Sequence, residues 1–209
     1  MKRKLIALVC ALGLLIPTAL ADGTSYLDVP EWEWYADVVA EMTEKGIMTG
    51  TKEGYFSPNS TVTRAMAVTV LWRLEGCPQP EDLNSFTDID PDDPEVYWYA
   101  PQAAWAKEAG IANGYTDGSF RGNKKVTREQ MASFIYQYAK YKGQPLAQGS
   151  LGLFDDAYKV SDWAVDAVKH AVGMGILQGN AHGELAPQSK TTRAALATML
   201  HRMMIEAVG

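Results

Sequence analysis

The stretch that decides the fold runs from Trp98 to Arg128 and reads WYAPQAAWAKEAGIANGYTDGSFRGNKKVTR. Its tryptophan stands 12 residues before a first glycine, 16 before a second glycine and 30 before the arginine. The same spacing, without insertion or deletion, recurs from Trp34 to Arg64 and from Trp163 to Arg193. One unit is therefore written three times, and such copies bury a shared core that a single copy cannot bury alone.

The N-terminal segment 1–21 has the pattern of a secretory signal peptide. Basic residues at positions 2–4 precede an apolar run over 5–16, and Ala19-Leu20-Ala21 fits a cleavage site. An uncleaved membrane anchor is the alternative, but the run is shorter than the roughly 20 residues that a spanning helix needs. We therefore expect a secreted protein with no segment in the membrane after cleavage.

Charge and cysteine content limit the classes of partner. The net charge of −6 at pH 7 becomes −9 when segment 1–21 is removed, because that segment holds three basic residues and no acidic one. Nucleic acid repels an acidic chain without a basic run, so we expect no nucleic-acid partner. Cys77 becomes the single cysteine, which excludes an intramolecular disulfide. We expect no cofactor and no metal, because HExxH, GxSxG, P-loop and paired Cys/His patterns are missing from the sequence.

Within each copy the pattern predicts two helices joined by a loop. The first helix begins near the tryptophan and ends at Gly46, Gly110 or Gly175, since glycine suits the left-handed conformation that terminates helices. The second helix begins after a threonine N-cap, and only copy two adds a glutamine three residues later to complete a capping box. These threonines are Thr63, Thr127 and Thr192.

Apolar residues at offsets +3, +7 and +10 from each arginine form one stripe along each second helix. They are Ala67, Leu71 and Leu74, then Met131, Ile135 and Tyr138, then Leu196, Leu200 and Met203. Three such stripes predict a central bundle of three helices with the first helices outside it. Short extended segments are expected in the loops at Phe56, Phe120 and Leu185, and 76–85 and 142–153 are expected to be surface linkers of one compact domain.

These elements resemble the S-layer homology module. The resemblance rests on an aromatic-x-Asp start, a Trp before Tyr or Ala, a Gly-Ile-x-x-Gly loop, an Asp-Gly-x-Phe-like turn and a Thr-Arg pair before an alanine-rich helix. It places repeats over 26–76, 86–140 and 154–204 and implies a mainly α-helical domain with three helix-loop-helix units in a pseudo-threefold arrangement. It also implies noncovalent binding to a secondary cell-wall polysaccharide linked to peptidoglycan, often one that carries pyruvate ketals.

Four positions of each copy supply chemistry that suits an anionic sugar. Arginine grips a carboxylate with two parallel hydrogen bonds, an indole offers a flat face to a sugar ring, and glycine admits a ligand close to the backbone. Aspartate accepts hydrogen bonds from hydroxyls, and backbone N–H groups in a first helical turn also favour an anion. The candidate ligand-binding residues are Asp28, Trp34, Gly50, Arg64, Asp88, Trp98, Gly114, Arg128, Asp156, Trp163, Gly179 and Arg193.

Each of these residue types also has a structural interpretation. The tryptophans can belong to the core, the glycines can end helices and the aspartates can cap them. Arginine is seldom buried unless it is paired, so we expect either a neighbouring aspartate or a ligand at those positions. The acidic turn is Asp117-Gly118 in copy two but His182-Gly183 in copy three, so copy three is expected to lose its site if the acid matters.

Two other classes of function remain open. The run from Asp88 to Asp93 supplies carboxylates for glycoside hydrolysis, but it has no equivalent in the other copies, and we expect a non-catalytic protein. Aromatic residues suit a protein interface as well as a sugar, so surface-layer assembly or binding to other cell-surface proteins is the alternative. The residues that favour it are Trp32, Tyr35, Tyr97 and Tyr99.

Overall fold

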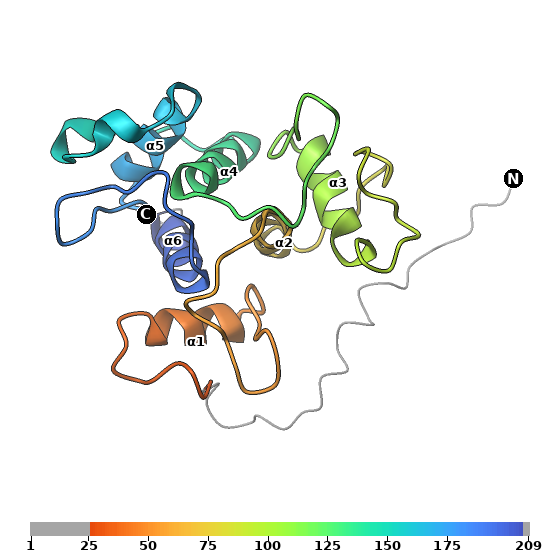
Figure 1. The fold of residues 1–209 in the computed structure, drawn as a ribbon, viewed down its shortest axis with the longest axis horizontal. Coiled ribbons are helices and arrows are strands. Elements are labelled where there is room, and N and C mark those ends of the chain that lie inside the picture. The colour runs from red at the N-terminus through yellow and green to blue at the C-terminus, as the bar shows by residue number, and fades with distance from the viewer. Residues whose placement is uncertain (1–25, 207–209) are drawn as a thin grey trace, which may run out of the picture.

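The computed structural model describes residues 26–206, and the segment 1–21 that is predicted to be a signal peptide lies outside that range. The α-helices in this range are α1 Ala36–Glu44, α2 Arg64–Leu74, α3 Ala100–Glu108, α4 Arg128–Tyr141, α5 Val165–Gly173 and α6 Arg193–Glu206. The 3-10 helices are η1 Tyr97–Tyr99, η2 Leu151–Leu153, η3 Ala157–Lys159 and η4 Asp162–Ala164. No strand forms over 26–206, so the predicted mainly α-helical fold is confirmed (Figure 1). Among these helices none is long and apolar enough to cross a membrane.

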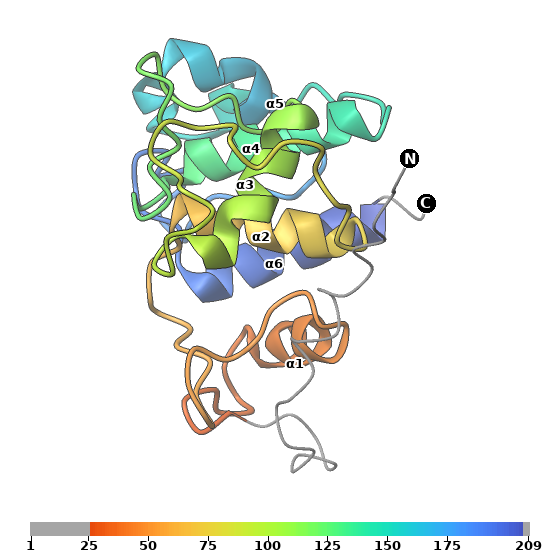
Figure 2. The ribbon, with the colours of Figure 1, turned by 90° about the vertical axis from the view of Figure 1, so that its right-hand side faces the viewer.

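Each first helix packs against the second helix of another copy. α3 lies on α2 and α5 lies on α4, while α1 of the first copy lies on α6 of the last copy. Figure 1 shows the pairs around a common centre, and in Figure 2 α1 and α5 lie at opposite ends of the view. The three copies therefore close into a ring of three lobes, and each lobe is built by two different copies.

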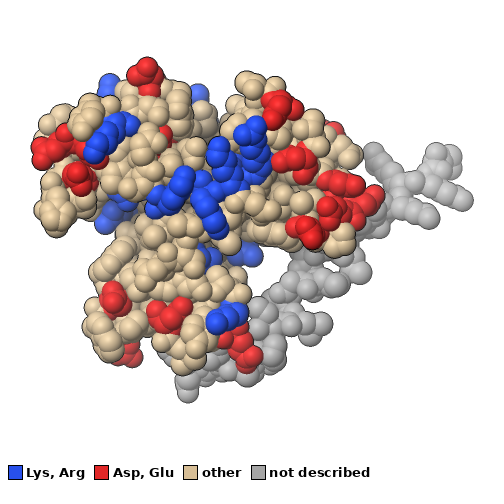
Figure 3. All heavy atoms as spheres, viewed as in Figure 1, with Lys and Arg blue, Asp and Glu red and all other residues tan. Residues whose placement is uncertain are grey.

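A triangle of backbone hydrogen bonds lies where the copies meet. The N–H of Val62 donates to Thr191, that of Thr191 to Val126 and that of Val126 to Val62, with N···O distances of 2.9, 3.0 and 3.0 Å. These residues stand at equivalent positions just before the second helices, so the triangle relates the copies by pseudo-threefold symmetry. Basic side chains gather near the middle of the face in Figure 3, and acidic side chains lie toward its edge.

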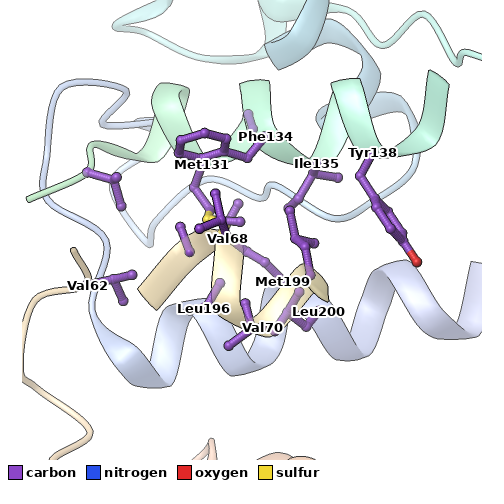
Figure 4. Packing of buried hydrophobic residues seen from close by; sticks show 14 of the residues in the cluster. Val62, Val68, Val70, Met131, Phe134, Ile135, Tyr138, Leu196, Met199 and Leu200 are labelled. Atoms are coloured by element: carbon purple, nitrogen blue, oxygen red, sulfur yellow. The ribbon is translucent and has the colours of Figure 1, made fainter. Parts of the chain in front are cut away.

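Side chains of α2, α4 and α6 meet in one apolar core (Figure 4). The predicted stripes are buried at every position except Leu74, which is partly buried against the same core. Full burial of one large aliphatic side chain contributes roughly 1.5–3 kcal/mol, so this core supplies much of the driving force for folding. The prediction of a central bundle made by the three second helices is confirmed.

Local side-chain chemistry sets the helix boundaries. The hydroxyls of Thr63, Thr127 and Thr192 accept the backbone N–H three residues on, at 3.2, 3.3 and 3.2 Å, which confirms all three predicted N-caps. Only Thr127 has the reciprocal bond, in which its own N–H donates to the side chain of Gln130. The first helices end, as predicted, at glycines in the left-handed conformation, Gly46, Gly110 and Gly175, with φ of 67°, 69° and 64°.

The loop segments predicted to be extended turn sharply instead. Phe56, Phe120 and Leu185 are buried, and none of them lies in a strand. The residue after each has a positive φ, 59°, 57° or 51°, so the chain bends at that point. Extended pairing within 26–206 is limited to isolated bridges, such as the one between Thr63 and Lys125.

Candidate functional site

Each repeated arginine reaches out of its own copy into the next one. Its guanidinium Nε donates to a loop carbonyl of the following copy, and the pattern is cyclic because copy three bonds to copy one. The pairs are Arg64 with Phe120, Arg128 with Leu185 and Arg193 with Phe56, at 2.7, 2.9 and 2.8 Å. We call Arg64, Arg128 and Arg193 the groove arginines. The guanidinium of each one therefore lies against the loop of the next copy.

The first two backbone N–H groups of α2, α4 and α6 also donate hydrogen bonds to carbonyls of the next copy. At α2 the N–H of Arg64 donates to Lys124 and that of Ala65 to Gly122, and α4 and α6 repeat both bonds. The third N–H of each helix donates to the capping threonine. The prediction that these N–H groups serve an anion is wrong, because their hydrogen bonds join one copy to the next.

The groove arginines are buried cations without a carboxylate partner. Arg64 and Arg193 are 8% and 7% exposed, and Arg128 is half-buried. Within residues 26–205 no Asp or Glu oxygen lies within 4.0 Å of any of them. Aromatic rings face the guanidinium groups instead: Cζ of Arg193 lies 4.4 Å from the Phe56 ring centroid, and Cζ of Arg64 lies 5.0 Å from that of Tyr115. Burial lowers the pKa of all three below the ordinary 12.5, but arginine stays charged at neutral pH.

A cavity of about 390 Å³ opens beside Arg64. Its wall comes from three copies: Arg64 from the first, the 111–115 loop and one face of α4 from the second, and Trp163 from the third. Trp34 and Gly50, which share a copy with Arg64, do not line this cavity. The structure therefore brings Arg64 together with Gly114 and Trp163, and the sequence order of the motif does not reflect the site.

The other two groove arginines follow the same cyclic relation. Nη2 of Arg128 donates to the carbonyl of Gln178 at 2.8 Å, and Nη2 of Arg193 donates to that of Thr49 at 2.5 Å. These carbonyls directly precede Gly179 and Gly50, the second glycines of the following copies. η1, which carries Trp98, packs on α2 in the same way that η4, which carries Trp163, packs on α4. The relation groups Arg193 with Gly50 and Trp98, and Arg128 with Gly179 and Trp34.

The repeated tryptophans are surface residues. Trp34, Trp98 and Trp163 are 67%, 47% and 59% exposed, whereas the residue after each of them is buried. In the first copy that residue is Tyr35, whose ring meets the Trp34 indole edge to face with centroids 5.1 Å apart. The interpretation of these tryptophans as core residues is therefore wrong, and a large part of each indole is in contact with solvent.

The repeated aspartates hold the loop bends. The two carboxylate oxygens of Asp156 accept the backbone N–H groups of Leu185 and Ala186, at 2.7 and 2.9 Å. Asp28 and Asp88 accept matching pairs in their own copies. The second donor of each pair is the residue with positive φ, so the carboxylate stabilises a backbone that non-glycine residues rarely adopt. The aspartates therefore have a structural role in the loop, but they do not cap the first helices, so that part of the structural interpretation is wrong. Contact with a sugar stays a prediction.

The second glycine of each copy has a steric role inside the protein. A Cβ at Gly114 would lie 2.7 Å from Cε1 of Phe86 and 2.7 Å from the carbonyl oxygen of Ser119. Gly50 and Gly179 are crowded in the same way by the first aromatic residue of their own copies. Close approach of a ligand to these glycines stays a prediction.

The acidic turn of copy two supports the loop. Asp117 accepts the N–H and the hydroxyl of Ser119 at 3.0 and 2.6 Å and pairs with Arg121 at 2.8 Å. The bonds from Ser119 and then from Arg121 lower the pKa of Asp117 well below its ordinary value. In copy three the side chain of Asn180 accepts the N–H groups of His182 and Glu184. The loop of copy three therefore keeps an equivalent turn without the acid.

The polar face of α4 is missing from the sequence-based prediction. Gln130, Ser133 and Gln137 stand at offsets +2, +5 and +9 from Arg128, between the positions of the buried stripe. All three line the cavity beside Arg64. Their helical spacing is the signal that identifies them, because polar residues on successive turns share one face.

Glu129 is a second residue that the pattern did not predict. It is 2% exposed, and its carboxylate accepts the N–H and the hydroxyl of Ser161, both at 3.0 Å, and the amide of Gln188 at 2.8 Å. Ser161 stands two residues before Trp163. Glu129 therefore fixes the loop that carries the indole of the Arg64 cavity.

The carboxylates of the Asp88 to Asp93 run are engaged in turns. Asp90 and Asp93 accept the backbone N–H groups of Asp92 and Glu95, both at 2.9 Å, and Asp88 holds the loop bend. Within the described range no group of three His, Cys, Asp or Glu side chains is placed to hold a metal ion.

A ring of helix-loop-helix copies, in which the arginine of one copy bonds to the loop of the next, defines a repeat-built helical domain. The family model of the S-layer homology domain matches residues 25–67, 85–132 and 153–197, and the chain belongs to this family. Domains of this family anchor S-layer proteins and enzymes to the cell surface.

Relatives with curated names share the whole repeat region. The chain is 30% identical over 189 residues to an S-layer protein of Bacillus thuringiensis subsp. finitimus, which covers 90% of this chain and 22% of that protein. It is 27% identical over 208 residues to an endoglucanase of Bacillus sp. (strain KSM-635), covering 96% and 22%. It is 28% identical over 190 residues to exoglucanase XynX of Acetivibrio thermocellus, covering 88% and 17%. The chain thus spans about a fifth of the length of these relatives.

Proposed function

We propose that this protein is a non-catalytic cell-surface anchor that binds a secondary cell-wall polysaccharide, linked to peptidoglycan, in the grooves between its copies. The observation that carries the proposal is the meeting of a buried, unpaired guanidinium and an exposed indole at one cavity, Arg64 with Trp163. A buried cation is stabilised by an anionic partner, and an indole face suits the C–H side of a sugar ring. A pyruvate ketal would place the required carboxylate on the sugar.

The charge around the cavity supports an anionic ligand. Arg121 and Lys124 lie 4.1 and 4.9 Å from the ring centroid of Tyr115, which lines the cavity. Figure 3 shows basic side chains near the middle of this face, although the net charge of the chain is −6. A local positive field of this kind attracts a polyanion in spite of the overall acidity.

Trp163→Ala tests the proposal directly, since this side chain lines the cavity and is 59% exposed, so its removal costs little stability. We expect about tenfold weaker retention on purified cell-wall sacculi, because a lost aromatic contact at a binding site commonly costs more than 1 kcal/mol. Trp32→Ala is the matched control, because Trp32 is 85% exposed and does not line the cavity. Equal retention of the two variants contradicts the site.

Sacculi stripped of their secondary polymer by hydrofluoric acid identify the ligand. The parent protein should be retained on native sacculi and released from stripped ones. A parent protein that is retained on neither preparation is not a wall anchor.

Assembly with other cell-surface proteins is the second candidate. Large exposed apolar side chains outside the cavity favour it, because such residues suit a protein interface. They include Leu27, Trp32, Leu153 and Tyr158, at 76%, 85%, 75% and 81% exposed. Tyr35 and Tyr99 are buried and cannot contribute, which corrects the sequence-based prediction for both. Equal retention on native and stripped sacculi would favour this function.

A further inference from the structure

The position nine residues after each groove arginine differs among the copies. It is Arg73 on α2, Gln137 on α4 and Arg202 on α6. The polar side of each second helix at this position faces the loop between the two glycines of the same copy. Two grooves therefore have a second arginine in their wall, and one groove has an amide there.

In the Arg193 groove both guanidinium groups are anchored on one loop. Nη1 of Arg73 donates to the carbonyl of Ile47 at 3.2 Å, and Nη2 of Arg193 donates to that of Thr49 at 2.5 Å. The two acceptors stand two residues apart in the Gly-Ile-x-x-Gly loop. Arg73 comes from the same copy as the loop, and Arg193 comes from the preceding copy in the ring.

The Arg128 groove repeats this arrangement. Nη1 of Arg202 donates to the carbonyl of Ile176 at 3.4 Å, and Nη2 of Arg128 donates to that of Gln178 at 2.8 Å. Burial lowers the pKa of Arg128, and the nearby charge of Arg202 lowers it further. The pKa of Arg193 is lowered by burial and by Arg73 in the same way.

Neither pair has a carboxylate in ion-pair contact among residues 26–205. Within that range no carboxylate oxygen lies within 4.0 Å of Arg73 or Arg202, as for the groove arginines themselves. Asp28 and Asp156, the aspartates that act on Arg193 and Arg128 at longer range, give both oxygens to backbone N–H groups. Two neighbouring cations repel each other, and an anion placed between them removes that repulsion.

The Arg64 groove lacks this pair. Gln137 takes the place of the second arginine, and Ile111, the equivalent of Ile47 and Ile176, lines the open cavity of about 390 Å³. Arg121, the other guanidinium nearby, is already paired with Asp117 at 2.8 Å.

We propose that the pairs Arg73 with Arg193 and Arg128 with Arg202 are two anion sites of higher affinity, each for one carboxylate or phosphate group, while the Arg64 groove, which has one guanidinium without a carboxylate partner, binds the same group more weakly. This rests on the proposed function, and it divides the three grooves into two kinds. Each guanidinium has five N–H donors in a planar fork, and the loop carbonyls occupy only part of them. Two forks facing one oxyanion offer the charge-assisted hydrogen bonds that hold carboxylate or phosphate best.

The test is a titration of the purified protein with inorganic phosphate and, separately, with pyruvate at constant ionic strength, followed by amide NMR. The reporters are the backbone amides of Gly50, Gly114 and Gly179, one in each loop. We expect the shifts at Gly50 and Gly179 to saturate at a probe concentration about tenfold lower than the shift at Gly114, because a second guanidinium adds charge-assisted hydrogen bonds. The probe that saturates at the lower concentration identifies the anion chemistry.

Single substitutions then change the anion affinity of one loop at a time. Arg73→Gln should weaken the response of Gly50 by about tenfold and leave that of Gly179, and Arg202→Gln should do the reverse, because an amide carries no charge. Gln137→Arg should strengthen the response of Gly114 by about tenfold, because it supplies the second guanidinium. That variant adds a donor to an open cavity, so it tests the proposal even if the arginine variants unfold.

Two results would overturn the proposal: an equal response of all three glycines in the parent protein, or an unchanged Gly50 response in Arg73→Gln. Sacculus binding is measured on the same samples and separates this proposal from the proposed function. A parent protein that binds native sacculi but neither probe keeps the anchor and loses the anion sites. A protein that binds both probes but no sacculi keeps the anion sites and loses the anchor.

Discussion

Three loop residues without the freedom of glycine adopt left-handed backbone because a carboxylate holds them there. Ser57, Arg121 and Ala186 have φ of 59°, 57° and 51°, and each N–H donates to the repeated aspartate of its copy. The left-handed conformation costs roughly 1–2 kcal/mol for a residue with a Cβ. The hydrogen bonds to both carboxylate oxygens offset this cost and fix the loop that receives a groove arginine.

Ala186→Gly should raise the free energy of unfolding by about 0.5–1 kcal/mol, because glycine avoids the left-handed strain but loses more backbone entropy on folding. Both bonds to Asp156 come from backbone N–H groups and survive the change. Urea unfolding measures the difference. Ala181→Gly in the same loop is the control, since Ala181 is exposed and has no positive φ. An equal gain in the control, or a loss in Ala186→Gly, contradicts the role of strain.

At the scale of elements, α5 is joined to the linker between copies two and three. The N–H of Ala147 donates to Nδ1 of His170 at 3.1 Å, and the N–H of Gly149 donates to the carbonyl of Lys169 at 2.8 Å. His170 is 2% exposed, and burial lowers its pKa below the ordinary 6.5. The neutral ring is needed, because protonation of Nδ1 would turn the acceptor into a donor facing the Ala147 N–H.

The stability of this contact should depend on pH. Because the folded-state pKa is the lower one, the unfolded chain binds the proton first as pH falls, so the contribution is complete above pH 6.5 and is lost below it. The loss is at most about 1.4 kcal/mol per pH unit. His170→Asn keeps an acceptor near the Nδ1 position and should flatten the dependence below pH 6.5. Urea unfolding at a series of pH values measures it, and an unchanged slope in the variant contradicts the assignment.

At the scale of the whole molecule, α1 and α6 close the ring between the first copy and the last. Val39 and Met42 of α1 are fully buried, and α1 packs on α6 as α3 does on α2. Arg193 adds a polar tie across the same junction through its bond to Phe56. The three copies should therefore unfold together and not one after another.

Met42→Ala should destabilise the entire domain by about 2–5 kcal/mol, since it leaves a cavity in the junction core. Tryptophan fluorescence and far-ultraviolet circular dichroism should report one coincident transition at a lower urea concentration. Two separate transitions would mean that α1 unfolds on its own and that the ring is not cooperative.

The elements were predictable from the sequence because their signals are local. A threonine cap and its N–H lie three residues apart, and a glycine ends a helix through its own backbone. The lobes were not predictable, because three copies of one pattern do not say which first helix packs on which second helix. The bond from Arg193 to Phe56 joins residues at opposite ends of the repeat region, and no spacing within one copy encodes it. For the same reason the sequence did not predict how the motif residues are divided among the copies that meet at one cavity.

The central claim is that one ligand groove is built by three copies, with Trp163 beside Gly114 and not beside Gly179. The most direct measurement is amide NMR of the parent protein and of Trp163→Ala, each titrated with purified fragments of the wall polysaccharide. The account predicts that the substitution removes the ligand-induced shift of the Gly114 amide and leaves that of Gly179. Loss of the Gly179 shift with the Gly114 shift intact would show that each copy forms its own site, and would contradict the account.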